Sequence, residues 1–222
     1  MNKIMVAAVH PDDETLGCGG TLLKYKNNGD EINWLIITKM SKEAGYTNKQ
    51  IEKRKNEITK VAELYNFNEI IQLDFPAAKL DSVPISNIIN SISETVKRIK
   101  PNILFIPFFK DVHTDHQIIF NAIWSCTKTF RYPYIKKIYM METVSETEFA
   151  PALQQNSFTP NYFVNIDHYL EKKIEIMKIY KSEIKEEPFP RSIENINAQA
   201  RFRGSTAGCN FAESFMLLKE IW

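Results

Sequence analysis

Two short segments rich in histidine and acid hold most of the groups in this chain that could do chemistry. The first, HPDDE, covers residues 10–14, and the second, DVHTDH, covers residues 111–116. Three of the chain's four histidines, His10, His113 and His116, fall in these two segments. Histidine and carboxylate side chains are the ligands of catalytic zinc sites, which use three protein ligands and leave a further position to water. The concentration of these side chains therefore indicates a site for a divalent metal.

Each of the two segments follows an apolar run that is typical of a buried strand. IMVAAV precedes His10, and NILFIPFF, residues 102–109, precedes the second segment. In an open α/β sheet, ligands bind beyond the carboxyl ends of the strands, so we expect the two segments to converge there. A metal also supplies the positive charge that clustered carboxylates need, because an unpaired buried carboxylate tends to become protonated instead.

Strand-like and helix-like segments alternate along the chain, which favours parallel pairing and right-handed crossovers. We therefore predict an α/β fold, a Rossmann-like three-layer αβα sandwich with a mostly parallel sheet. Further strands are predicted at 31–38, 69–73, 137–141 and 162–166, and helices at 20–28, 48–66, 86–100, 115–128, 167–182 and 192–203. We interpret residues 1–222 as a single α/β domain whose less regular C-terminal portion, 130–222, shapes the substrate side. The long polar loop between the last two predicted strands is expected to face the substrate.

The composition excludes several other classes of protein. A net charge of +1 with interspersed basic and acidic residues argues against a nucleic-acid partner and a polybasic membrane anchor. No window approaches the roughly 20 apolar residues of a membrane span. The three cysteines, Cys18, Cys126 and Cys209, are odd in number and far apart. This pattern suits a reducing compartment, so a cytoplasmic location is expected, whereas homo-oligomer formation stays open.

The two segments resemble the paired signatures of the PIG-L/LmbE-like family of zinc-dependent N-deacetylases, which act on N-acetylglucosaminyl compounds. The likeness extends to Arg54-x-x-Glu57, to Asp74 and to ARFRGSTAGCNFAESF at residues 200–215. It implies an enzyme that removes the acetyl group from an N-acetylated amino sugar or glycoconjugate, with acetate released by attack of a zinc-bound water. Fe²⁺ or another divalent metal could replace Zn²⁺ at a histidine and carboxylate site.

Carried over position by position, the resemblance implies that His10, Asp13 and His116 bind the zinc. Asp12 would then be the general base, a role worth about 10²–10⁴-fold in rate. His113 would be the general acid or would stabilise the oxyanion. We expect Asp115 to hydrogen-bond His113 and keep it charged.

Arg54 and Asp74 are the expected sugar-binding residues, because sugar hydroxyls need both a charged donor and a carboxylate acceptor. An ion pair between Arg54 and Glu57, or a helix cap, explains the same residues equally well. Glu14 is expected to steady the first loop through backbone amides. The sequence leaves open whether three residues near the C-terminus shape the site or form a subunit interface: Arg201, Arg203 and Glu213.

Three alternative functions follow from the same residues. An amidase for a larger acyl conjugate would differ only in the room left for the acyl group. A nucleotide-binding module is disfavoured because GCGGT does not fit G-x-G-x-x-G, and acids stand where a pyrophosphate needs free amides. A noncatalytic sugar-binding protein would not need to keep Asp12 and His113 beside the three candidate ligands.

Overall fold

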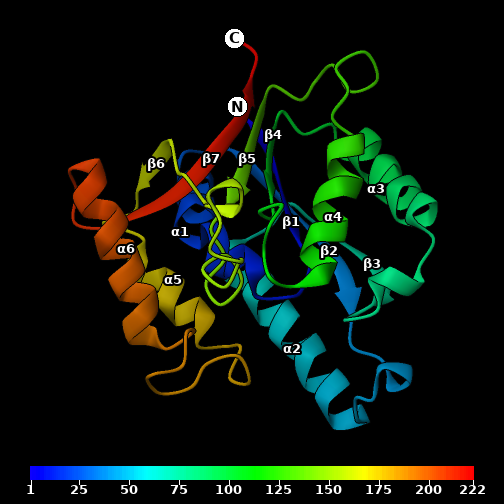
Figure 1. Ribbon diagram of the computed structural model, residues 1–222, viewed down its shortest axis with the longest axis horizontal. Coiled ribbons are helices and arrows are strands. Elements are labelled where there is room, and N and C mark those ends of the chain that lie inside the picture. The colour runs from blue at the N-terminus through cyan, green and yellow to red at the C-terminus, as the bar shows by residue number, and fades with distance from the viewer.

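A seven-stranded sheet forms the centre of the molecule, in the order β3-β2-β1-β4-β5-β7-β6 (Figure 1). The computed structural model describes residues 1–222. Strands β1 to β5 pair in parallel, and only β7 runs antiparallel to its neighbours β5 and β6. The strands are β1 (Lys3–Ala8), β2 (Glu31–Lys39), β3 (Glu69–Pro76), β4 (Ile103–Ile106), β5 (Lys137–Met141), β6 (Tyr162–Asn165) and β7 (Ala212–Glu220).

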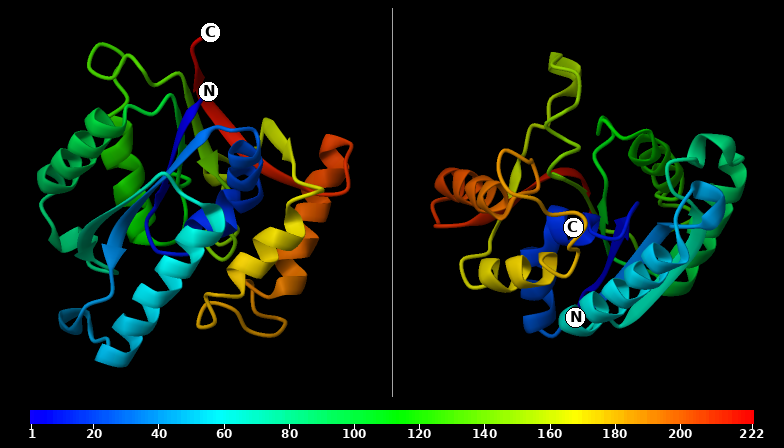
Figure 2. Two further views of the ribbon diagram at one scale, coloured as in Figure 1. Left: turned by 180° about the vertical axis from the view of Figure 1, so that it is seen from behind. Right: turned by 90° about the horizontal axis from the view of Figure 1, so that it is seen from below.

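Six α-helices cover both faces of this sheet. Helices α1, α2, α5 and α6 pack on one face, and α3 and α4 pack on the other (Figures 1 and 2). The predicted three-layer, mostly parallel α/β sandwich is therefore confirmed. The helices are α1 (Asp13–Asn27), α2 (Asn48–Tyr65), α3 (Ile85–Ile99), α4 (Thr114–Ser125), α5 (Leu170–Met177) and α6 (Ile193–Ala207).

Strand β1 shows why its sequence is apolar at every position after Lys3. Its side chains alternate between the two faces of the sheet, and both faces are buried. Ile4, Val6 and Ala8 belong to the core on the α1 side, whereas Met5 and Ala7 belong to the core on the α3 side. A charged residue is therefore excluded until the strand ends, and the first polar side chains follow directly beyond its carboxyl end.

Helix α1 begins at Asp13, earlier than the predicted start at residue 20, and it is interrupted at Cys18, whose φ of −150° is not helical. Glycines weaken the helical pattern in sequence, but close packing requires them here. A Cβ atom on Gly19 would lie 2.5 Å from the hydroxyl oxygen of Tyr65, and one on Gly20 would lie 2.8 Å from Ile166. These glycines therefore serve contacts between elements and not a phosphate, which agrees with the poor fit to a nucleotide-binding motif.

The C-terminal part departs most from the predictions. Helix α5 is shorter than the predicted 167–182, and strand β7 was not predicted at all. Glu213 and Ser214 interrupt the apolar pattern at the start of β7, yet both are buried there. Residues after 130 supply β5, β6 and β7 to the same sheet.

None of the helices combines the length and the apolar composition needed to cross a membrane.

Candidate active site

The two segments rich in histidine and acid meet at one edge of the sheet because β1 and β4 are adjacent parallel strands. Potential ligand atoms of His10, Asp13 and His116 all lie within 4.8 Å of one another. Asp13 is central to this group. Its Oδ2 accepts a hydrogen bond of 2.8 Å from the His10 backbone and lies 3.4 Å from His116 Nε2. The structure thus brings together the three side chains expected to hold a metal.

The ring of His116 is held by a second carboxylate. Its Nδ1 lies 2.8 Å from Asp111 Oδ2, and both side chains are almost completely buried. The opposite nitrogen, Nε2, is buried and has no hydrogen-bond partner. A buried polar atom without a partner is costly, whereas a carboxylate on the other ring nitrogen is the usual support of a metal-binding histidine. The donor set therefore fits a divalent metal.

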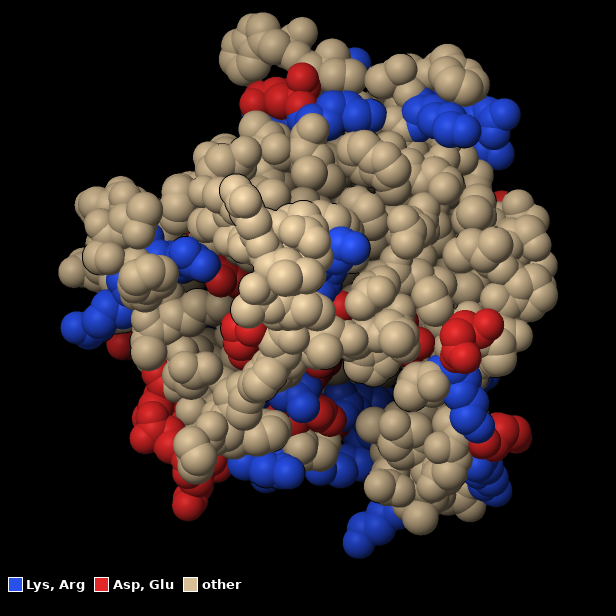
Figure 3. Space-filling model, in the orientation of Figure 1, with Lys and Arg blue, Asp and Glu red and all other residues tan.

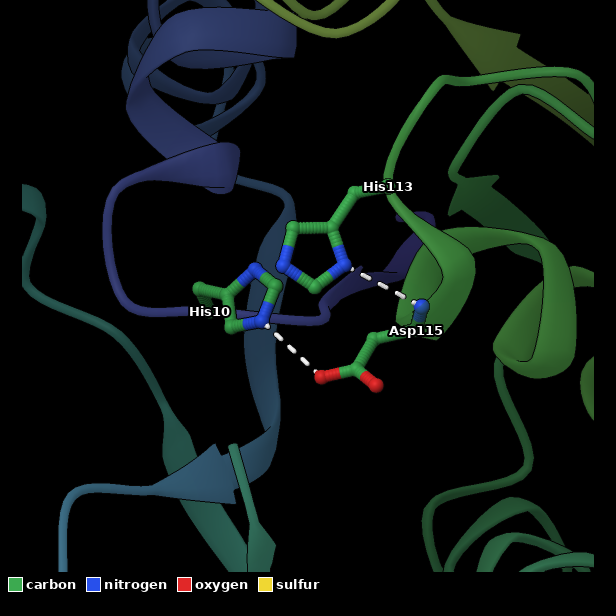
Figure 4. Close-up of side chains that lie close together, drawn as sticks. All are labelled: His10, His113 and Asp115. Carbon is green, nitrogen blue, oxygen red and sulfur yellow. Dashed lines mark hydrogen bonds and ion pairs between the residues drawn. The ribbon is translucent and has the colours of Figure 1, made fainter. Parts of the chain in front are cut away.

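Asp115 does not have the partner expected from the sequence. Its carboxylate accepts hydrogen bonds from the backbone of Ala78 at 2.7 Å and of Leu80 at 3.2 Å, and it lies 3.3 Å from His10 Nε2 (Figure 4). It is the backbone N–H of Asp115, not its carboxylate, that contacts the His113 ring. Although burial raises the pKa of Asp115, the bonds from His10 and the two amides lower it overall. The expected hydrogen bond between this carboxylate and His113 is therefore not present.

His113 caps helix α4 and accepts a 3.1 Å hydrogen bond at Nδ1 from the Asp115 backbone (Figure 4). Since Nδ1 is the acceptor, the ring proton sits on Nε2 and the imidazole is neutral. Burial, followed by the neighbouring His10 and His116, lowers the pKa of His113 to about 4. The structure thus presents a neutral N–H donor beside the candidate metal ligands instead of the expected charged imidazolium.

Asp12 lies beside Asp13, one of the candidate metal ligands, and close to a basic side chain. Its backbone has a φ of 141°, a strained value for a residue with a side chain, and the residue is only 4% exposed. The Arg191 guanidinium lies 3.3 Å from its carboxylate. Burial and then the adjacent Asp13 raise the pKa of Asp12 well above its usual value, although Arg191 and Arg54 oppose this change.

Glu14 holds the strained loop from within. Its carboxylate accepts hydrogen bonds from the Asp12 backbone at 3.1 Å, from Thr15 at 2.7 Å and from the Tyr180 hydroxyl at 2.9 Å. Burial raises the pKa of Glu14 to about 7. Through these contacts Glu14 supports the loop, which is the structural role expected from the sequence. The Asp12 side chain lines the cavity.

A cavity of about 500 Å³ opens beside these groups. Its walls come from the two segments, from the loop after β2, from α2 and from the region between α5 and α6. Acidic and basic side chains are interspersed on the face of the molecule shown in Figure 3. The residues that line it include His10, Asp12, Asp13, Arg54, His113 and Glu146.

Both residues expected to bind the sugar line this cavity, in different ways. Arg54 is buried and held by the protein itself: its guanidinium donates to the Pro11 carbonyl at 2.6 Å, lies 3.2 Å from the Glu57 carboxylate and pairs with Glu183. The ion pair with Glu57 that the sequence offered as an alternative is therefore present. Asp74 lies at the rim, with a half-exposed side chain 3.5 Å from Lys39.

None of the three residues left open near the C-terminus lines the cavity. Arg201 stacks on Phe211, and Arg203 pairs with Glu142. Glu213 instead braces helix α1, because its carboxylate accepts hydrogen bonds from the backbones of Gly20 at 2.9 Å and Thr21 at 2.7 Å. The polar loop between β5 and β6 contributes only Glu146, near its start, to the cavity wall.

Sequence reasoning missed three residues of the site. Asp111 belongs to the second segment, and its position five residues before His116 could have suggested the contact that now orients that histidine. Arg191 reaches Asp12 from 179 residues away, and no local pattern in the sequence indicates this contact. Glu146 follows β5 and has no sequence signal that distinguishes it from a surface acid.

A family model described as PIG-L, GlcNAc-PI de-N-acetylase, matches residues 4–127, which is more than half of the chain. The chain belongs to the PIG-L family. The family expected from the sequence motifs is thus confirmed, and with it the N-deacetylase class of enzyme. The matched residues include both segments that form the candidate active site.

This member of the PIG-L family resembles a named deacetylase and several solved structures over nearly its whole length. It is 23% identical over 241 residues to the diacetylchitobiose deacetylase of Thermococcus kodakarensis, covering 100% of this chain and 85% of that protein. A conserved protein from Thermus thermophilus has a TM-score of 0.79 and 24% identity, covering 100% and 97% of the two chains. The N,N'-diacetylchitobiose deacetylase of Pyrococcus horikoshii has a TM-score of 0.78 and 18% identity, covering 98% and 84%. These structures share the fold.

Proposed function

We propose that this protein is a zinc-dependent hydrolase that removes the acetyl group from an N-acetylated amino sugar or glycoconjugate and releases acetate. One observation carries the proposal most strongly. His116 Nε2 is buried without a hydrogen-bond partner and lies 3.4 Å from the carboxylate of Asp13, which lines a cavity of about 500 Å³, large enough for a sugar. Membership of the PIG-L family and the similarity to a diacetylchitobiose deacetylase support the same substrate class.

His10, Asp13 and His116 would hold the metal. When bound, a divalent metal supplies a water of lowered pKa, about 7 in place of 15.7, and polarises the amide carbonyl. The protein itself orients the ligands. The Asp111 carboxylate contacts the ring of His116, and the Asp115 carboxylate contacts the ring of His10. Zinc is the expected ion, although Fe²⁺ satisfies the same ligand types.

Asp12 is the proposed general base. Its raised pKa suits proton transfer near neutral pH better than that of an exposed carboxylate, which is a weaker base. The Asp12 carboxylate accepts a proton from the attacking water and then delivers it to the nitrogen of the departing amine. Arg191 holds the carboxylate in place during both transfers.

His113 is proposed to stabilise the oxyanion as a neutral donor. Its Nδ1 is already occupied by the Asp115 backbone, so Nε2–H is the group available to the acetamide oxygen. A single preorganised donor of this kind is worth about 10²–10³-fold in rate. Arg54 supports the Pro11 carbonyl and the cavity wall, and Asp74 at the rim is available to sugar hydroxyls.

The three cysteines are free in the folded chain, which supports a reducing compartment such as the cytoplasm.

The proposed reaction is tested by measuring acetate release from N-acetyl sugars in free, glycosidic and nucleotide-linked form, with and without a chelator. We expect release from at least one of these sugars and its loss in the chelator. Release from none of them by metal-loaded protein would contradict the proposal and favour an amidase for a larger acyl group.

A further inference from the structure

Among the carboxylates that line the cavity, Glu146 alone has a fully buried oxygen without a hydrogen-bond partner. Asp12 pairs with Arg191, and Asp13 accepts from the His10 backbone. Oε2 of Glu146, by contrast, is buried and hydrogen-bonds to no group of the protein. The other oxygen, Oε1, has no hydrogen-bond partner in the protein either and is not among the buried atoms. Burying part of a carboxylate that receives no hydrogen bond is costly, so the retention of Glu146 in the cavity wall points to a donor on the substrate that reaches Oε1.

The turn that carries Glu146 is built to hold it in one place. Ser145 has a positive φ of 76°, and its N–H donates to Glu148 Oε1 at 2.6 Å. Within the same turn, the Thr147 hydroxyl accepts from the Thr143 N–H at 2.9 Å. Strained backbone that persists beside a functional site is often part of that site's preorganisation.

The same turn is fastened to the loop that carries the metal ligand. The Glu146 carbonyl accepts a hydrogen bond of 3.1 Å from the Val112 N–H. The Thr147 hydroxyl donates to Asp111 Oδ1 at 2.7 Å, and the other oxygen of Asp111 orients His116. The position of Glu146 relative to the metal ligands is therefore fixed by the network that fixes the ligands themselves, as a specificity-determining residue requires.

We propose that Glu146 selects the substrate by accepting a hydrogen bond from a hydroxyl on one of the two ring carbons that flank the acetamido carbon. This inference rests on the proposed function. These two carbons are bonded directly to the acetamido carbon, so their hydroxyls are the sugar hydroxyls nearest to the reacting amide. A site that offers an acceptor to a substrate hydroxyl discriminates strongly against an analogue that lacks it.

The test combines deletion of the carboxylate with deletion of the hydroxyl. Acetate release is measured for N-acetylglucosamine and its 1-deoxy and 3-deoxy analogues, using wild-type protein, Glu146→Ala and Glu146→Gln. In the wild type, we expect one of the two deoxy changes to lower kcat/KM about 10- to 100-fold, the range of a hydrogen bond to a charged group. In Glu146→Ala that penalty disappears, and in Glu146→Gln part of it returns because the amide oxygen still accepts.

Glu148→Gln is the matched control, because Glu148 is exposed and does not line the cavity, and the amide oxygen of Gln still accepts the hydrogen bond from the Ser145 N–H that supports the turn. It should keep the full discrimination between the sugars. An equal loss for all three sugars in Glu146→Ala, or a penalty that survives unchanged in that variant, overturns the inference.

A binding measurement separates this inference from the proposed reaction. The same three sugars are titrated calorimetrically into zinc-loaded Asp12→Asn protein, with and without Glu146→Ala. Discrimination that depends on Glu146, without acetate release by the wild type, supports the hydroxyl contact and contradicts the reaction. Acetate release with no dependence of discrimination on Glu146 supports the reaction and contradicts the hydroxyl contact.

Discussion

The chemistry of this protein depends on how each side chain near His116 is held. Asp111 occupies one ring nitrogen of His116 and leaves the other directed at Asp13. The Asp115 backbone occupies one nitrogen of His113 and leaves the other free to donate. In both rings a fixed partner decides which nitrogen serves the reaction, so residues outside the cavity determine what the site can do.

Replacing Asp12 with Asn tests the proposed base. The amide cannot accept a proton from water, so we expect turnover to fall by about 10²–10⁴-fold. Metal content should stay at the wild-type level because Asp12 is not among the three candidate ligands. The measurements are acetate release and elemental analysis of the same sample. Wild-type turnover in this variant would remove Asp12 from the mechanism.

Replacing Asp111 with Asn tests the support of His116. The neutral amide weakens the bond to the imidazole, and we expect metal affinity to fall about 10- to 100-fold. Competition with a chromogenic chelator measures this change. Thr147→Val is the control, since it removes the other hydrogen bond to Asp111 but leaves the contact with His116 in place. An unchanged metal affinity in Asp111→Asn would show that the Asp111 carboxylate does not strengthen metal binding by His116.

At the scale of elements, helix α1 is the component that places Asp12 and Asp13, and it is braced where it breaks. Around the irregular Cys18, Lys173 Nζ donates to the Leu16 carbonyl at 2.9 Å and to Glu213 at 2.7 Å. The backbone groups left unpaired by the break are thus satisfied by side chains of α5 and β7. The C-terminal part of the chain therefore supports the N-terminal metal loop.

Replacing Lys173 with Met should strongly destabilise the fold. It leaves Glu213 buried without its counter-charge, and breaking a buried pair in this way costs about 3–5 kcal/mol. Both side chains are 4% exposed. Urea unfolding measures the free-energy difference. The adjacent Lys172 provides the control, because its pair with Glu175 is exposed and Lys172→Met should cost at most about 1 kcal/mol. Equal effects of the two substitutions would contradict a bracing function for the buried pair.

Topology and motif were predictable because both are local in the sequence. The apolar run before His10 and the helix-like segments between strands specify parallel βαβ units, and these bring His10 beside His116. The partner of Asp115 could not be predicted, because the Ala78 and Leu80 amides that it binds lie 37 and 35 residues away. Strand β7 was missed because Glu213, a buried charge, interrupts its apolar pattern.

At the scale of the whole molecule, the candidate metal joins segments that are more than 100 residues apart in the chain. Binding to the folded state alone should therefore stabilise the protein by about 2.7 kcal/mol at a metal concentration of 100 times Kd. This corresponds to about 5–10 °C in Tm for a chain of this size. Thermal unfolding with and without a chelator measures the shift. His116→Ala should show none, and a shift of equal size in that variant would place the metal elsewhere.

Titration of metal into metal-free protein, with acetate release as the readout, tests the central claim most directly. We predict no release from metal-free protein, a rise in proportion to added zinc up to one ion per chain, and no rise in His116→Ala. Full acetate release by metal-free protein, or a full rise in His116→Ala, would contradict a deacetylase centred on His10, Asp13 and His116.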